Sequence, residues 1–193
     1  WDTGTNANWL NEGAPDNFLF LDDVVFDDSG SAAPAVTLIG DQTPNSVTVA
    51  ADVSYTFSGA GKITGPTGLV KTNAGTLTIN TANDYTGPTI IGGGTISVVQ
   101  LANGGAASRL GAASSDSANL QFFNSALQYT GGNVTVDRGA TLAGGGGTFN
   151  VTSGGTTLTW SGTNIGSGTL IKSGAGTLTL SAANSFTGGT IIN

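Results

Sequence analysis

Apolar residues occur along this chain in short clusters of two to four, separated mainly by Gly, Asn, Ser and Thr. In several clusters two apolar residues enclose one threonine, as in Val47-Thr48-Val49 and Leu77-Thr78-Ile79. Successive side chains of a β-strand point to opposite faces, so this alternation places the apolar pair on a buried face and threonine outside. The pattern predicts an all-β fold of many short strands.

The clusters mark the expected strands, whose spacing is typical of both β-sandwiches and solenoids. They cover residues 18–21, 24–26, 36–39, 47–49, 55–57, 69–70, 77–79, 90–91, 96–99, 120–123, 127–129, 134–136, 149–151, 158–160, 170–171, 178–180 and 191–192.

An internal repeat separates these two architectures. Residues 69–91 read LVKTNAGTLTINTANDYTGPTII and residues 170–192 read LIKSGAGTLTLSAANSFTGGTII, with 14 of 23 positions identical. Repetition within one small chain indicates stacked units that share a continuous core. Each unit holds three apolar clusters, which favours one coil of a parallel β-helix.

The repeat also predicts which side chains point inward and where the chain turns. Glycines that precede strands are expected at tight turns with positive φ, namely Gly75, Gly87, Gly176 and Gly188. The predicted coil interior contains Leu77, Ile79, Ile90, Leu178, Leu180 and Ile191. The predicted outer face contains Thr76, Thr78, Thr177 and Thr179.

The motifs of these two copies resemble a known family. Residues 74–79 (AGTLTI) with 83–87 (NDYTG), and residues 174–180 (GAGTLTL) with 184–190 (NSFTGGT), are similar to the autotransporter-associated β-strand repeat of bacterial surface proteins. The opening, with Trp1-Asp2, Asn8-Trp9, Pro15 and residues 22–26 (DDVVF), resembles the segment that often precedes such repeats. Two departures are Pro88, which stands where the second copy has Gly189, and residues 100–168, which contain no further clear copy.

The resemblance implies a right-handed parallel β-helix with an amino-terminal cap. We expect residues 1–60 to form the cap and first coils, and residues 61–193 to form the β-helix repeats of one continuous solenoid. It also implies an extracellular or bacterial cell-surface location.

Composition excludes several classes of function. The chain has no Cys and no His among 193 residues, which excludes disulfides, thiol nucleophiles and the usual zinc or haem sites. A net charge of −7 argues against nucleic acid, whose binding needs clustered Lys and Arg. No apolar run approaches the ~20 residues that span a bilayer, so no membrane span is expected.

The acidic residues raise two alternatives. Asp22-Asp23 and Asp27-Asp28 offer oxygen ligands of the kind that Ca²⁺ takes. The intervening residues 24–26 read as a strand, however, so the four carboxylates are expected to flank it as solvated turn residues. We therefore expect no metal site and no cofactor, and calcium stays the open alternative.

Catalysis is not expected either. Glycoside hydrolysis needs one carboxyl group held protonated in a partly apolar cleft, and no pair of acids is singled out by the sequence. A β-elimination lyase needs a basic group near the abstracted proton. The available basic residues lie far apart along the chain; they are Lys62, Lys71, Arg109, Arg138 and Lys172. No catalytic residue is predicted.

Aromatic residues gather near the amino terminus, at Trp1, Trp9, Phe18, Phe20 and Phe26. They predict an apolar plug over the end of the solenoid, because terminal units must shield the core. A sugar-stacking platform is the alternative, and it would make surface glycans the partner. Trp160 is expected in the core.

Two functions follow from these observations. The first is a structural surface segment, a stalk, fibre or adhesin-type passenger that gives length and stiffness. The second is a carbohydrate-binding or polysaccharide-active β-helix. Residues 1–61 carry a net charge of −9 and residues 62–193 a net charge of +2, which favours head-to-tail association. Ile191-Ile192 are left near an open apolar edge, so we expect end-to-end contact with copies of itself or with further repeats, and the charge difference sets only its polarity.

Overall fold

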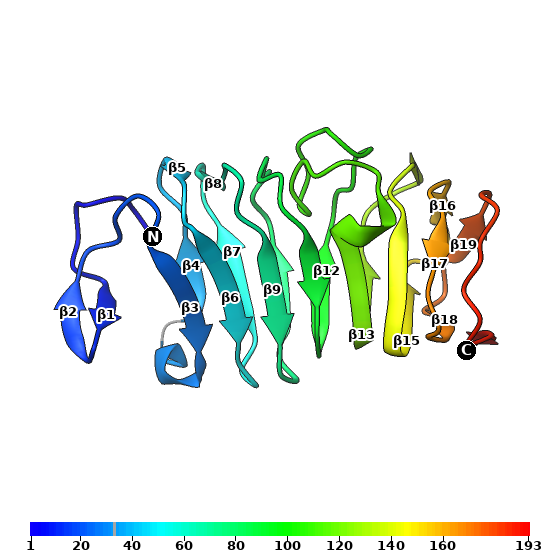
Figure 1. Cartoon of the computed structure of the whole chain (residues 1–193), viewed down its shortest axis with the longest axis horizontal. Helices are drawn as coiled ribbons and strands as arrows, with labels where there is room; N and C mark the ends of the chain where they lie inside the picture. The colour runs from blue at the N-terminus through cyan, green and yellow to red at the C-terminus, as the bar shows by residue number, and fades with distance from the viewer. Residues whose placement is uncertain (33) are drawn as a thin grey trace.

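The computed structural model of the chain describes residues 1–32 and 34–193. Its regular structure is β-strand apart from two short 3-10 turns, at Asp28–Gly30 and Ser117–Asn119. The strands stack side by side into an elongated parallel β-solenoid of about 8 turns, with the two chain ends at opposite ends of the stack (Figure 1). The all-β, parallel β-helix expectation is confirmed.

Each turn of the solenoid crosses three faces in the same order. The strands of the first face pair from one turn to the next in parallel register. They are β3 (Asp23–Asp27), β6 (Ser46–Ala50), β9 (Leu69–Thr72), β11 (Thr89–Ile91), the first parts of β13 (Leu120–Tyr129) and β15 (Ala140–Val151), and β17 (Asn164–Ile165).

The second face follows one corner later and is also fully parallel. It contains β4 (Ala35–Thr37), β7 (Tyr55–Ser58), β10 (Thr76–Ile79), β12 (Thr95–Val98), the second parts of β13 and β15, β18 (Leu170–Ser173) and β20 (Thr190–Ile192). In β13 the register shifts between Phe123 and Ser125, so one long strand bends from the first face to the second.

The third face is the least regular. It contains β5 (Asp41–Gln42) and β8 (Lys62–Ile63), and later β14 (Val134–Val136), β16 (Thr157–Trp160) and β19 (Thr177–Leu180). Between β8 and β14 the face is continued by short backbone contacts, such as Asp84 N to Ile63 O at 3.1 Å. Residues 99–119 leave this face as an excursion that rises above the neighbouring turns in Figure 1.

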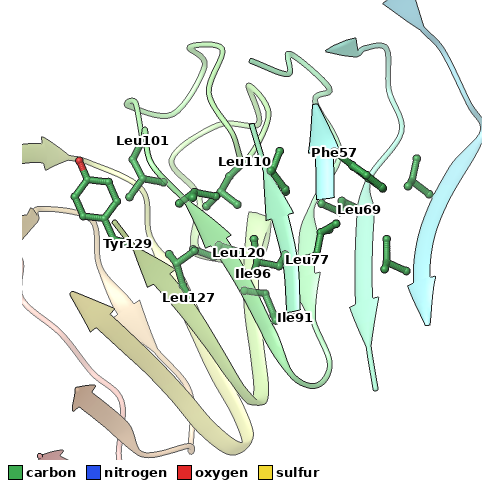
Figure 2. Close-up of a cluster of buried hydrophobic side chains, with 14 of the residues drawn as sticks. Phe57, Leu69, Leu77, Ile91, Ile96, Leu101, Leu110, Leu120, Leu127 and Tyr129 are labelled. Atoms are coloured by element: carbon green, nitrogen blue, oxygen red, sulfur yellow. The ribbon is translucent and has the colours of Figure 1, made fainter. Parts of the chain in front are cut away.

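The core is a column of side chains that stack in register from turn to turn. Leu77 lies beside Tyr55 on one side and Ile96 on the other, and all three are buried. The row continues from Ile96 to Leu127, and Figure 2 also shows the buried Ile91 and Leu120 of the first face. Trp160 is fully buried against Phe149, with ring centroids 5.0 Å apart. The predicted core position of Trp160 is confirmed.

The predicted inward and outward assignment holds for most positions. Leu77 and Ile79 are buried, and Thr76 and Thr78 lie on the outer face. Leu178 and Leu180 pack against the core but are half-buried, because β19 belongs to the last turn. Thr177 and Thr179 are exposed.

Two of the inward assignments are wrong. In β11 it is Thr89 and Ile91 that are buried, and Ile90 faces outward. The Tyr85 hydroxyl lies 2.8 Å from the Thr89 hydroxyl in the core, which satisfies the threonine there. Ile191 pairs in register with Ile171 on the outer row, so it also faces outward.

The predicted strand at residues 18–21 is absent. This segment is a turn around Leu21, whose φ is 67°.

The glycine prediction is wrong in mechanism. Gly75 and Gly176 do not have positive φ; a Cβ on either would lie within 2.5 Å of a backbone oxygen of the preceding turn. Gly87 and Gly188 are equally confined by backbone atoms. These glycines are required by the close approach of stacked corners. At the corners of Gly75 and Gly176 the left-handed position is two residues earlier, at Asn73 (φ 61°) and Gly174 (φ 77°).

Candidate binding surfaces

The amino-terminal end is closed by an aromatic plug. Trp1 contacts Trp9 and Phe18 with ring centroids 5.5 and 5.2 Å apart, and Trp9 lies 5.1 Å from Phe26. Phe26 continues the stack to Phe57 in the core, at 4.9 Å. The plug prediction is confirmed for these rings. It is wrong for Phe20, which is 66% exposed on the turn before β3.

Trp9 of the plug lies on a hairpin that the hydrophobic pattern does not predict. Strands β1 (Trp9–Asn11) and β2 (Ala14–Asp16) pair antiparallel around Glu12 and Gly13, which both have positive φ. Such a pair of positive φ values is typical of a two-residue hairpin turn. The hairpin forms a sheet of its own, separate from the solenoid. Trp1 joins the body instead, since Ile39 N donates to Trp1 O at 2.8 Å.

A groove lies between this hairpin and strand β3, and we call it the β3 groove. It consists of two neighbouring hollows that share Trp9, Leu10 and Asp23 in their walls. The first hollow also reaches Leu19 and Asp22, and the second reaches Val25, Asp27 and Tyr55.

Strand β3 presents a free edge to the groove. It is the terminal strand of its ladder and pairs only with β6. Within the described chain, no backbone hydrogen bond joins residues 23–27 to the hairpin. An unpaired strand edge is a template for another strand.

Asp23 and Asp27 are the end residues of β3 and do not lie in flanking turns, so the turn expectation is wrong for these two. The acidic residues of this region are hydrogen-bonded individually. Asp23 accepts from Asn45 Nδ2 at 2.7 Å and Ser46 Oγ at 2.6 Å, and these bonds lower its pKa. Hydrogen bonds from Ser29 likewise lower the pKa of Asp27. Both carboxylates are therefore ionised at neutral pH.

Asp28 and Asp52 link consecutive turns. Asp28 Oδ1 accepts from the backbone N–H groups of Asp52 and Val53, at 2.9 and 3.0 Å. Asp52 Oδ1 accepts in the same way from Ala74 N at 2.9 Å. Within residues 1–32 and 34–193, no three His, Cys, Asp or Glu side chains converge on one point. That Asp22, Asp23, Asp27 and Asp28 bind no calcium stays a prediction.

Most basic residues serve the fold, a role the sequence analysis did not assign to them. Lys62 Nζ lies 2.6 Å from Asp84 Oδ2 and 3.6 Å from Asp41 Oδ2, and the hydrogen bond to Asp84 raises the pKa of Lys62. Lys71 is fully buried, and burial lowers its pKa.

Arg138 fixes the excursion from inside. It is 3% exposed, and it donates to Ala102 O at 2.8 Å, Gly111 O at 2.7 Å and Ser108 Oγ at 3.2 Å. Burial lowers the pKa of Arg138, and burial also raises the pKa of nearby Tyr85 to about 12. A guanidinium with five donors can bind several carbonyl oxygens at once. The excursion is therefore held by the following turn.

Comparison with known proteins agrees with the repeat and the solenoid. A family model described as the passenger-associated-transport-repeat matches residues 69–98 and 170–193. The "Adhesin BmaC autotransporter" of Brucella suis biovar 1 (strain 1330) is 46% identical over 137 residues, which is 69% of this chain. The chain is an autotransporter passenger repeat protein. The matched stretch is 4% of the Brucella relative, and no solved structure matches the chain.

The structure explains what the passenger repeats share. Lys71 Nζ donates to Thr72 O and to Asn73 O, and Lys172 Nζ donates to Ser173 O and Gly174 O. Each lysine thus binds the carbonyl groups at its own corner. The sequence could have indicated this role. In LVKT and LIKS the alternation of a strand places Lys on the same, inward face as Leu.

The repeat asparagines connect adjacent turns. Asn83 Oδ1 accepts from Ile63 N at 2.9 Å and Asn184 Oδ1 accepts from Asn164 N at 2.8 Å, in each case from the preceding turn. Asn83 is fully buried. Among the residues that the structure describes, no helix has the length and apolar character needed to cross a membrane.

Proposed function

We propose that this passenger repeat protein is a non-enzymatic segment of a surface-exposed adhesin, which supplies length and stiffness and presents its excursion outward. The observation that carries the proposal is the uninterrupted parallel register of the first two faces, together with the likeness to an autotransporter adhesin. Stacked turns that share one core resist bending as a unit.

Several observations support a structural role over catalysis. Four of the five basic side chains bind carboxylates or carbonyl oxygens of the fold. The acids near the plug are occupied by hydrogen bonds from neighbouring residues. The carbohydrate alternative is less supported, because the plug rings pack against one another rather than lying flat and open.

The display role is tested on intact bacteria that carry the full passenger containing this chain. An epitope inserted between residues 105 and 106, which are both exposed in the excursion, should bind antibody without permeabilisation. Antibody binding that requires permeabilisation would contradict surface display. Turnover of any polysaccharide by the purified chain would contradict the non-enzymatic role.

The finer part of the proposal is stacking at the carboxy-terminal turn, on a second copy or on further repeats. Ile192 is 79% exposed and Leu178 and Leu180 are only half-buried there, whereas the other end carries the plug. Light scattering of the isolated chain at about 50 µM should show association that Ile192→Lys weakens. A monomer at that concentration would exclude self-association.

A further inference from the structure

We propose that the β3 groove binds an extended cationic peptide segment of a partner protein, which adds to the free edge of β3 as a strand. The inference extends the proposed adhesin role by naming a partner chemistry. The binding itself is a property of the chain and is testable on it alone.

The backbone of β3 supplies the first requirement. Strand addition needs a row of unpaired N–H and C=O groups with access from the side. β3 offers this row, because it ends its ladder and the hairpin is not bonded to it. The neighbouring ladder differs at the same end, since Trp1 covers the edge of β4 through Thr37 O and Ile39 N.

Apolar side chains supply the second requirement. Leu10 is 68% exposed and Val25 is 55% exposed, and both line the groove, as does Leu19. Exposed apolar side chains gathered along one groove are typical of an interaction site.

Charge decides which peptide fits. The groove walls contain Asp16, Asp22, Asp23 and Asp27, and residues 1–61 contain no Lys or Arg. The carboxylates of Asp23 and Asp27 are held ionised by their hydrogen bonds. Asp23, Val25 and Asp27 share the outer face of β3, and Val24 and Phe26 face inward. A strand that alternates apolar and basic residues would therefore place its basic set along the outer face near the carboxylates and its apolar set on the inward side.

The probe is a fluorescent six-residue peptide of alternating Lys and Val, with binding measured by anisotropy. We expect saturable binding that weakens with rising salt. A Glu-Val peptide, and a Lys-Val peptide N-methylated at alternate residues, should each bind at least about tenfold more weakly. N-methylation removes the donors that strand pairing requires and leaves the charge unchanged.

The matched variants lie in one outer row of the first face. Val25→Lys adds a cation inside the groove and should weaken Lys-Val binding at least about tenfold. Val70→Lys, two strands away in the same register, should leave binding unchanged. Both positions face outward, and circular dichroism verifies that both variants fold.

The proposal is overturned by any of four results. They are absence of Lys-Val binding, equal binding of the N-methylated peptide, equal effects of the two variants, and a groove that binds glycans or a second copy of the chain while the peptide does not bind. Surface display on intact cells is independent of all four.

Discussion

Lys71 and Lys172 occupy the same position of the two passenger repeats but lie on different faces of the solenoid. Lys71 in β9 stacks between Val49 and Ile91 on the first face. Lys172 in β18 stacks between Phe149 and Ile192 on the second face. The second repeat is therefore rotated by one face relative to the first. The local sequence of each repeat defines a strand, a corner and a second strand. The number of residues between the two repeats decides on which face of the solenoid each strand lies.

The first prediction concerns the core column. Leu77→Asp should lower the free energy of unfolding by about 3–5 kcal/mol, because it places a charge at a fully buried position. Thr78→Asp, on the outer face of the same strand, should change it by less than about 1 kcal/mol. Urea denaturation measures both. Equal losses would contradict the inward and outward assignment. Leu178→Asp should cost less than Leu77→Asp, because Leu178 is half-buried.

The second prediction concerns the asparagine that connects turns. Asn83→Ala should destabilise the chain by about 2 kcal/mol, because it leaves the buried Ile63 N–H without its acceptor. Asn80→Ala is the control, since Asn80 is exposed and its side chain makes no hydrogen bond with the described residues. A shift in melting temperature for Asn80→Ala as large as that for Asn83→Ala would show that the loss is unspecific.

The third prediction concerns the excursion. Arg138→Ala should increase amide hydrogen exchange across residues 99–119, because several carbonyl oxygens lose their shared donor. Arg138→Lys should restore protection only in part, since an ammonium has three donors and cannot reproduce the planar fork. Exchange in the first two turns serves as the internal reference. Unchanged exchange in the excursion would mean that hydrogen bonds within residues 99–119, and not Arg138, stabilise it.

The fourth prediction concerns acid. The pKa values of Asp23 and Asp27 are lowered from 3.8 by their hydrogen bonds, so the folded state binds these protons less readily than the unfolded chain. Their contribution to stability is fully present above about pH 5 and is lost as the pH falls through the lowered values. Asp23→Asn combined with Asp27→Asn should reduce the decline in unfolding free energy between about pH 5 and pH 2. The control is Asn80→Ala, which removes an exposed side chain without a titratable group and should leave that decline intact.

Much of the solenoid follows from the sequence because its strands repeat a simple alternation. The alternation places Leu77 and Ile79 in the core. Trp160 is placed there because it is an isolated aromatic residue among polar neighbours. The prediction for Ile90 is wrong because two adjacent isoleucines do not show which of them faces inward. In the structure Thr89 is buried and its hydroxyl contacts that of Tyr85, so Ile91 faces inward and Ile90 faces outward. Periodicity carries no information about such a hydroxyl pair.

The candidate binding surface was less predictable. The aromatic cluster indicated a plug, but the hairpin that carries Trp9 has too few apolar residues to show alternation. The free edge of β3 depends on which strand lies at the end of a ladder, which only the assembled topology shows. In the sequence Arg138 is only an isolated basic residue, because its carbonyl partners lie 27 to 36 residues earlier in the chain.

The excursion between β12 and β13 leaves the register of the strands on either side undisturbed. Thr95 still pairs with Ala126 and Ile96 with Leu127, although the chain has left the third face in between. The solenoid therefore tolerates a long interruption at this corner. Protein engineers can use the exposed part of the excursion as a grafting position, where a foreign peptide is carried by a rigid rod and the rod's own assembly is left intact.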